Sequence, residues 1–248
     1  MVRVRQFAVL LALLFASVSC PAASPARVDT LVAKSERVVV HPVHHASFLL
    51  EWGDLVIAVD PVGDADAFLR LGHPHLVLVT HQHGDHFDPD VLRDVATDHV
   101  LVIAPLAVAE MIPSLDAIVL AAGDRHLAGG IAVTAVPAYN QTPERQQFHP
   151  PGRDNGYLLE SHDLRVYVSG DTEDVPELAA IGPVDAAFIC CNLPFTMSVE
   201  QASRAVGAIR PRVLYPYHYR HRDGSLADLD RLRALIDDSI DVRVLAWY

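Results

Sequence analysis

The residues that could carry chemistry gather in one short segment, residues 81–86, which reads His-Gln-His-Gly-Asp-His. Alternate residues of an extended chain share a face, so His81 and His83 point the same way. A tight turn at Gly84 brings Asp85 and His86 to an adjacent point. Imidazole nitrogens and carboxylate oxygens are the ligands that Zn²⁺ favours in hydrolytic sites, and Mn²⁺ or Fe²⁺ accept the same set. The segment therefore predicts two neighbouring metal positions.

An alternative interpretation of this segment is a group of ordinary surface histidines at the end of a strand. That interpretation suits a single histidine. It is weak for three histidines and an aspartate within six positions, because each uncompensated imidazole near a core would cost free energy.

Two isolated residues extend the predicted metal site. Asp171 follows the apolar run 166–168 through Gly170, and His218 follows the run 213–215. Both residues stand at strand ends, where functional side chains often lie. Each alone would be an ordinary turn residue, but the preceding motif favours a role in the same site.

Short apolar runs must position these residues. The pair Gly53-Asp54 predicts a hairpin between strands at 48–50 and 55–59, and the continuous run 76–79 predicts a strand buried on both faces. Helices are predicted at 88–96, 199–209 and 226–236. Further strands are predicted at 38–40, 101–103, 118–120, 131–136, 157–159, 166–168, 186–189, 213–214 and 242–245. The pattern predicts an α/β (α+β) fold with two sheets and outer helices, and the long irregular stretch 139–156 predicts a functional loop.

Composition and charge narrow the class of protein. The chain has 248 residues, of which 51% are hydrophobic, and this suits one domain with a substantial core. Acidic residues outnumber basic ones 31 to 19, which gives a net charge of −12. This charge argues against a nucleic-acid partner and favours a small-molecule substrate.

Residues 1–26 have the pattern of a signal peptide. Arg3 and Arg5 precede an apolar run over 7–18, and small, turn-prone residues follow it. The run is shorter than the roughly 20 residues of a membrane-spanning helix. We therefore expect an exported periplasmic or secreted protein without a transmembrane helix, whose functional domain spans 27–248. Cys20 lies in a weak likeness of a bacterial lipoprotein box, so a lipid anchor at Cys20 is an alternative.

Four segments together resemble the metallo-β-lactamase superfamily: Asp60-Pro61 after a strand, residues 81–86, residues 169–172 and residues 215–219. The resemblance covers nearly all of the chain after the signal region. It implies an αβ/βα four-layer sandwich with a metal centre at one edge of the two sheets.

The resemblance also implies a role for each site residue. His81 and His83 would bind the first metal ion, and Asp171 would bridge both ions. The second ion would be bound by Asp85, His86 and His218. Asp85 would also hold the nucleophilic water and pass a proton to the leaving group.

One position departs from the pattern of the superfamily. Asn140 stands where most members with two metals carry another histidine, and a neutral amide is a weak ligand for zinc. Either His149 supplies the missing nitrogen, or the first ion is loosely held. His149 could equally contact the substrate. His45 is expected to support the ligands from behind, and the alternative is an ordinary strand histidine without a role in the site.

The sequence thus predicts a metal-dependent hydrolase, with zinc as the favoured metal. A metal-activated water would attack an ester, lactone or phosphodiester in a small substrate. The alternative is a non-catalytic metal-binding or sensing protein on the same scaffold. An open coordination position separates the two, because a closed metal site is structural.

Overall fold

The computed structural model describes residues 28–97 and 99–248. The predicted signal peptide over 1–26, with Cys20, lies outside the described residues, so export stays a prediction. Within the described part of the chain, no helix is both long and apolar enough to cross a membrane.

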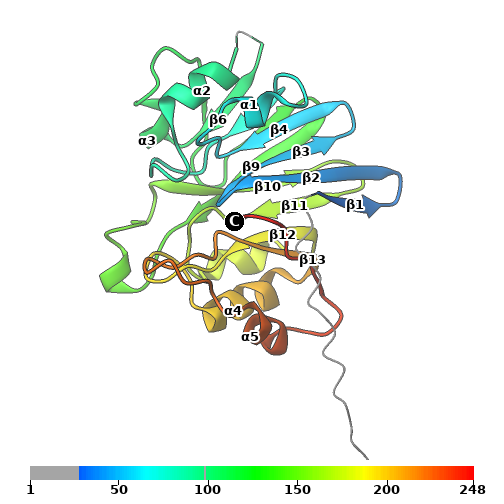
Figure 1. The fold of residues 1–248 in the computed structure, drawn as a ribbon, viewed down its shortest axis with the longest axis vertical. Coiled ribbons are helices and arrows are strands. Elements are labelled where there is room, and N and C mark those ends of the chain that lie inside the picture. The colour runs from blue at the N-terminus through cyan, green and yellow to red at the C-terminus, as the bar shows by residue number, and fades with distance from the viewer. Residues whose placement is uncertain (1–27, 98) are drawn as a thin grey trace, which may run out of the picture.

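Two seven-stranded sheets face each other and form the centre of the molecule (Figure 1). The first sheet contains, in spatial order, β1 (Asp29–Ala33), β2 (Glu36–His44), β3 (Ser47–Trp52), β4 (Leu55–Val59), β5 (Leu76–Leu78), β6 (Leu101–Ala104) and β7 (Ile118–Val119). The second contains, from its opposite edge, β8 (Arg125–Ala128), β9 (Ile131–Ala138), β10 (Asp154–Glu160), β11 (Arg165–Val168), β12 (Val184–Cys190), β13 (Pro211–Tyr217) and β14 (Asp241–Val242).

The two sheets repeat one topology. In each, four antiparallel strands come first, and the fourth strand then begins a parallel series. Hairpins make the antiparallel half, whereas parallel neighbours need longer crossover connections. The carboxyl ends of the parallel strands consequently lie together in each sheet.

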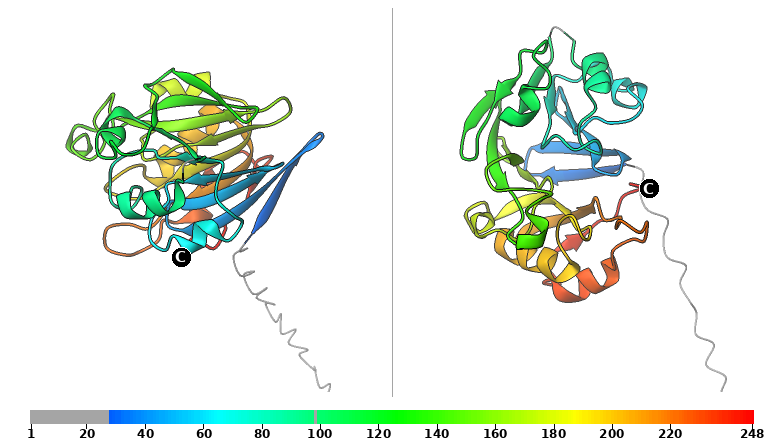
Figure 2. Two further views of the ribbon diagram at one scale, coloured as in Figure 1. Left: turned by 90° about the horizontal axis from the view of Figure 1, so that it is seen from above. Right: turned by 90° about the vertical axis from the view of Figure 1, so that its left-hand side faces the viewer.

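Helices cover the outer faces (Figures 1 and 2). The first sheet carries α1 (Asp66–Leu69), α2 (Pro89–Val95) and α3 (Leu106–Ala109), and the second carries α4 (Val199–Ile209) and α5 (Leu229–Leu235). Two short 3₁₀ helices, η1 (Pro143–Arg145) and η2 (Pro176–Ala180), lie in connecting segments. The predicted four-layer sandwich is confirmed.

Alternation along the strands creates two cores. In β4, Ile57 and Val59 enter the main core between the sheets, whereas Val56 and Ala58 enter the core under α1 to α3. Successive strand side chains point to opposite faces, so a strand buried on both faces must be apolar throughout. This explains the unbroken hydrophobic runs of the central strands.

The structure differs from the predicted elements at several boundaries. Strands β1 and β8 were not predicted, and β10 begins at Asp154, three residues before its predicted start. The polar residues that open β10 pair with Pro137 and Ala138 of β9 and are buried, so tertiary contacts outweigh their low strand propensity. Helix α5 begins at Leu229 because Asp228 caps it, accepting a hydrogen bond from a backbone NH in its first turn.

Candidate metal centre

The predicted site residues meet at the end of the sandwich where the parallel strands finish. Asp60 follows β4, the segment 80–86 follows β5, Asp171 follows β11 and His218 follows β13. Loop residues carried by the ends of parallel strands are a frequent place for a site. The two sheets contribute comparably, so the site lies where they adjoin.

The first group of side chains contains His81, His83 and His149, whose ligand nitrogens all lie within 4.8 Å of one another. His149 Nε2 also lies 3.3 Å from Asp171 Oδ2. His81 and His149 are fully buried, and His83 is partly exposed. Three imidazoles and one carboxylate oxygen therefore converge on this position.

The second group surrounds the other oxygen of the same carboxylate. Asp171 Oδ1 lies 3.4 Å from His86 Nε2 and 3.5 Å from His218 Nε2. His218 Nε2 lies 3.3 Å from Asp85 Oδ2. The carboxylate of Asp171 thus stands between the two groups, with one oxygen toward each.

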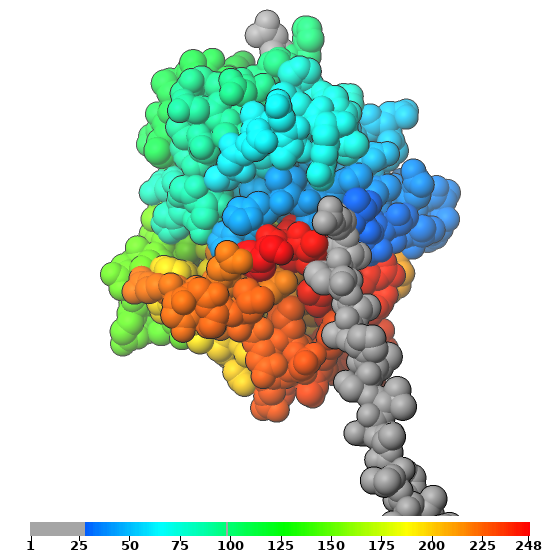
Figure 3. Space-filling view, in the orientation of Figure 1, coloured from blue at the N-terminus to red at the C-terminus, as the bar shows by residue number. Residues whose placement is uncertain are grey.

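His45 lies beside this second group. Its Nε2 atom is 3.4 Å from Asp85 Oδ2, and its ring centre is 4.0 Å from that of His218. Its backbone NH donates to the carbonyl of Trp247, and the C-terminal segment lies against the first sheet at the surface (Figure 3). His45 therefore contacts Asp85, one of the residues predicted to bind metal.

The structure separates the two residues that the sequence left as alternatives. The side-chain amide nitrogen of Asn140 donates hydrogen bonds to the carbonyls of Arg145 and Phe195. Its backbone NH donates to the carbonyl of His149 at 2.8 Å. Asn140 accordingly holds the loop, and His149 joins the group with His81 and His83.

Two carboxylates that the sequence analysis did not assign to the site lie behind the histidines. Asp60 Oδ2 accepts a hydrogen bond from His86 Nδ1 at 2.7 Å, and the backbone NH and hydroxyl of Thr80 hold Asp60 at 2.7 Å each. Asp154 Oδ2 lies 3.0 Å from His149 Nδ1. Such contacts fix the orientation and tautomer of a ligand histidine and leave Nε2 free to bind.

Three residues of the site have a strained backbone conformation, which sets the direction of their side chains. His45, Asp60 and His218 have φ values of 55°, 46° and 46°, in the left-handed region that residues with a Cβ rarely adopt. Such a conformation costs about 1–2 kcal/mol per residue. A Cβ at Gly156 would lie 2.7 Å from the carbonyl oxygen of Ser169, so only glycine allows β10 to approach the segment that carries Asp171.

Burial and charge set the protonation states of the site. Burial is the main cause that lowers the pKa values of His81 and His83, and neighbouring histidines lower them further. Burial would also lower the pKa of His86, but the carboxylates of Asp171 and Asp60 raise it well above its usual range. Burial would raise the pKa of Asp171, but the adjacent imidazoles hold it well below its usual range. The ionised carboxylates favour a cation here.

Comparison with known proteins identifies the family. The family profile described as the β-lactamase superfamily domain matches residues 40–218. The chain belongs to the metallo-β-lactamase superfamily. The matched region runs from β2 to His218 and includes every residue of the two groups.

The curated relatives are metal-dependent hydrolases by name. The UPF0173 metal-dependent hydrolase of Pyrococcus horikoshii is 29% identical over 213 residues, covering 81% of this chain and 93% of the relative. That of Methanopyrus kandleri is 30% identical over 188 residues, covering 71% and 81%.

Solved structures agree with this assignment. A crystal structure from Parabacteroides distasonis, provisionally named a metal-dependent hydrolase, has a TM-score of 0.80 and 36% identity, and the match covers 89% of this chain and 98% of that one. Igni18, a metallo hydrolase of Ignicoccus hospitalis, has a TM-score of 0.70 at 23% identity, covers 84% and 94%, and supports the fold alone. The predictions of the superfamily, the fold and a metal-dependent hydrolase are confirmed at that level.

Proposed function

We propose that this protein is a zinc hydrolase with two adjacent metal positions. His81, His83 and His149 would hold the first ion, and Asp171 would bridge to the second. The remaining ligands of the second ion would be Asp85, His86 and His218.

One observation carries the proposal: ligand atoms converge but lack hydrogen-bond partners. Within residues 28–97 and 99–248, the buried atoms without one include His81 Nε2, His86 Nε2, His218 Nε2 and Asp171 Oδ1. Each such atom costs about 1–3 kcal/mol if it stays unsatisfied. Two cations, one at each position, would satisfy these atoms together, and this donor set of imidazoles with carboxylates fits zinc.

The open side of the site gives Asp85 its role. When bound, the ions would lower the pKa of a water molecule to about 7, so that it becomes a nucleophile, and would polarise the substrate oxygen. The side chain of Asp85 is 48% exposed, whereas that of Asp171 is 4% exposed. Asp85 can therefore accept the proton of the attacking water and deliver it to the leaving group. The imidazoles of His218 and His45, whose Nε2 atoms lie 3.3 and 3.4 Å from Asp85 Oδ2, outweigh the effect of partial burial and lower the pKa of Asp85, which keeps it ionised.

We propose a small ester, lactone or phosphodiester as the substrate. Hydrolysis by an activated water needs no covalent intermediate, and all three bond types present an oxygen that a metal polarises. The net charge of −12 makes a nucleic-acid polymer an unfavourable partner.

The test measures metal content and hydrolysis together. Elemental mass spectrometry of the protein purified without chelator should give two zinc ions per chain, falling to one in His149→Ala. Asn140→His should not raise the number. Lactone and phosphodiester panels would then be screened, with His83→Ala as the inactive, folded control. An active His83→Ala variant that keeps its full metal content would refute the ligand assignment.

The non-catalytic alternative has a distinct outcome. It would be favoured by one ion or fewer in the wild type, rising to two only in Asn140→His. Asn140 motivates it, because that residue stands where many members of the superfamily have a histidine.

A further inference from the structure

A chain of charged contacts runs from Arg153 to the first metal position. Arg153 Nε and Nη2 donate to the two oxygens of Asp154 at 2.6 and 2.9 Å. Asp154 Oδ2 lies 3.0 Å from His149 Nδ1. The side chains of Asp154 and His149 are each 1% exposed, so this carboxylate has little access to water and depends on these partners.

The same guanidinium also holds the backbone next to His149. Arg153 Nη2 donates to the carbonyl of Phe148 at 2.6 Å, and lies 3.5 Å from His83 Nε2. On the other side, the NH of Asn140 donates to the carbonyl of His149. Arg153 thus fixes both the backbone that carries the imidazole and the carboxylate that orients it.

At the second metal position, none of the described arginines or lysines contacts the carboxylate of Asp60. Asp60, which orients His86, receives its other hydrogen bonds from the backbone NH and hydroxyl of Thr80. These donors are neutral, and they belong to the strand end that carries the histidine motif. The first position instead depends on a planar fork, which only arginine provides.

We propose that Arg153 is a positioning residue that holds His149 in place for the first metal ion through Asp154. The inference rests on the proposed function, because it requires His149 to be a metal ligand. Without the fork, the carboxylate would lose one rigid partner and the Phe148 carbonyl would be released. His149 Nε2 would then no longer be held toward Asp171, His81 and His83.

The test is a metal titration of the full chain. Zn²⁺ would be titrated against a chromophoric chelator, and Co²⁺ absorption would report the geometry at each position. The part of the wild-type Co²⁺ absorption that disappears in His149→Ala would be assigned to the first position. Arg153→Lys, which keeps the charge but loses the fork, should weaken that position about 10- to 100-fold and alter its spectrum, with the second position unchanged.

A double variant shows whether Arg153 acts through Asp154. Asp154→Asn should weaken the same position, and the pair Arg153→Lys with Asp154→Asn should weaken it no more than the worse single variant. Additive losses would overturn the inference.

Arg145→Lys is the matched control. Arg145 is 23% exposed, compared with 22% for Arg153, and it anchors the same loop through Glu173. Arg145→Lys should leave the Zn²⁺ affinity of both metal positions unchanged. An equal loss in Arg145→Lys, or no loss in Arg153→Lys while the wild type binds two ions, would overturn the inference alone. A wild type that binds fewer than two ions would instead overturn the proposed function and this inference with it.

Discussion

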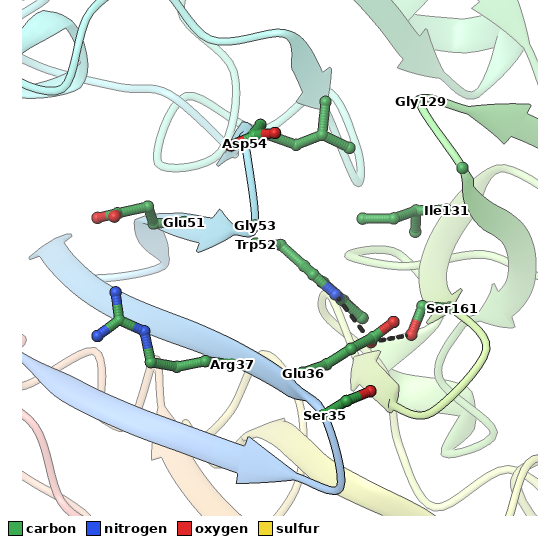
Figure 4. A pocket seen from close by; sticks show the side chains of 12 residues that line it. Ser35, Glu36, Arg37, Glu51, Trp52, Gly53, Asp54, Gly129, Ile131 and Ser161 are labelled. Carbon is green, nitrogen blue, oxygen red and sulfur yellow. Dashed lines mark hydrogen bonds between the residues drawn. The ribbon is translucent and has the colours of Figure 1, made fainter.

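The two ends of the sandwich differ in how their polar groups are satisfied. At the end away from the histidines, hairpin turns surround a pocket of 520 Å³ (Figure 4). There Glu36 Oε2 accepts hydrogen bonds from Trp52 Nε1 and Ser161 Oγ. At the other end, ligand atoms of His81, His86, His218 and Asp171 have no such partner in the described part of the chain. On the proposed function, the chemistry lies where unsatisfied atoms converge and not in the pocket at the other end.

The cause of this difference is the direction of the strands. The pocket is lined by the start of β2, the end of β3 and the turns Gly53-Asp54 and Gly129-Gly130. Each of these turns is a two-residue connection between neighbouring antiparallel strands. The carboxyl ends of the parallel strands have longer connections, and such loops can carry ligands without disturbing the sheets.

The strongest test of the comparison is Asp171→Asn. The substitution keeps the size of the side chain but removes the charge between the two groups. We expect the loss of both ions and a fall in hydrolysis of about 1000-fold or more, since metal activation supplies several kcal/mol of transition-state stabilisation. Metal analysis and single-turnover rates on the best substrate check this. Retention of two ions would show that Asp171 is not the bridge.

A smaller effect is expected from Asp60→Asn. The amide oxygen can accept from the NH of Thr80, but the amide nitrogen that replaces Oδ2 accepts neither from the Thr80 hydroxyl nor from His86 Nδ1. The second metal position should weaken about 10- to 100-fold, with the first unchanged. Competition titration with a chelator measures the affinity of both metal positions. Asp185→Asn is the control, because its carboxylate lies near the starts of β11 and β12, at the other end of the sheet. An equal loss in the control would contradict the assignment.

The smallest effect is expected from Glu36→Gln in the far pocket. The amide oxygen can still accept one hydrogen bond, so the free energy of unfolding should fall by about 1 kcal/mol or less. Hydrolysis and metal content should not change. Denaturant unfolding and the assay used for Asp171→Asn measure both. A large loss of hydrolysis in Glu36→Gln would contradict the conclusion that the pocket at this end takes no part in the chemistry.

The sequence predicted those parts of the site whose residues are close together in the chain. His81, His83, Asp85 and His86 share one segment, so their common location needed no knowledge of the fold. The apolar runs of the central strands were predicted for a similar reason, because burial on both faces demands hydrophobic side chains throughout.

The supporting residues could not be predicted in the same way. Asp154 is a single acidic residue next to an arginine, and nothing in its local sequence separates it from a turn residue. Asp60 belongs to a segment that resembles the superfamily, but that segment predicted no role for its carboxylate. Their roles depend on β4 lying beside β5 and on β10 starting at Asp154. The choice between Asn140 and His149 likewise required the path of the loop over 140–153.

The shared position of the site between the sheets has a consequence for folding. Asp85 and His86 come from the first half of the chain, whereas His149, Asp171 and His218 come from the second. On the proposed function, each bound ion is a reversible cross-link between halves that are otherwise joined by apolar packing, hydrogen bonds and ion pairs such as that of Arg243 with Asp29. Free metal about 100-fold above its Kd would add about 2.7 kcal/mol to the free energy of unfolding. The supply of metal would then govern how long the folded protein survives, as well as how fast it works.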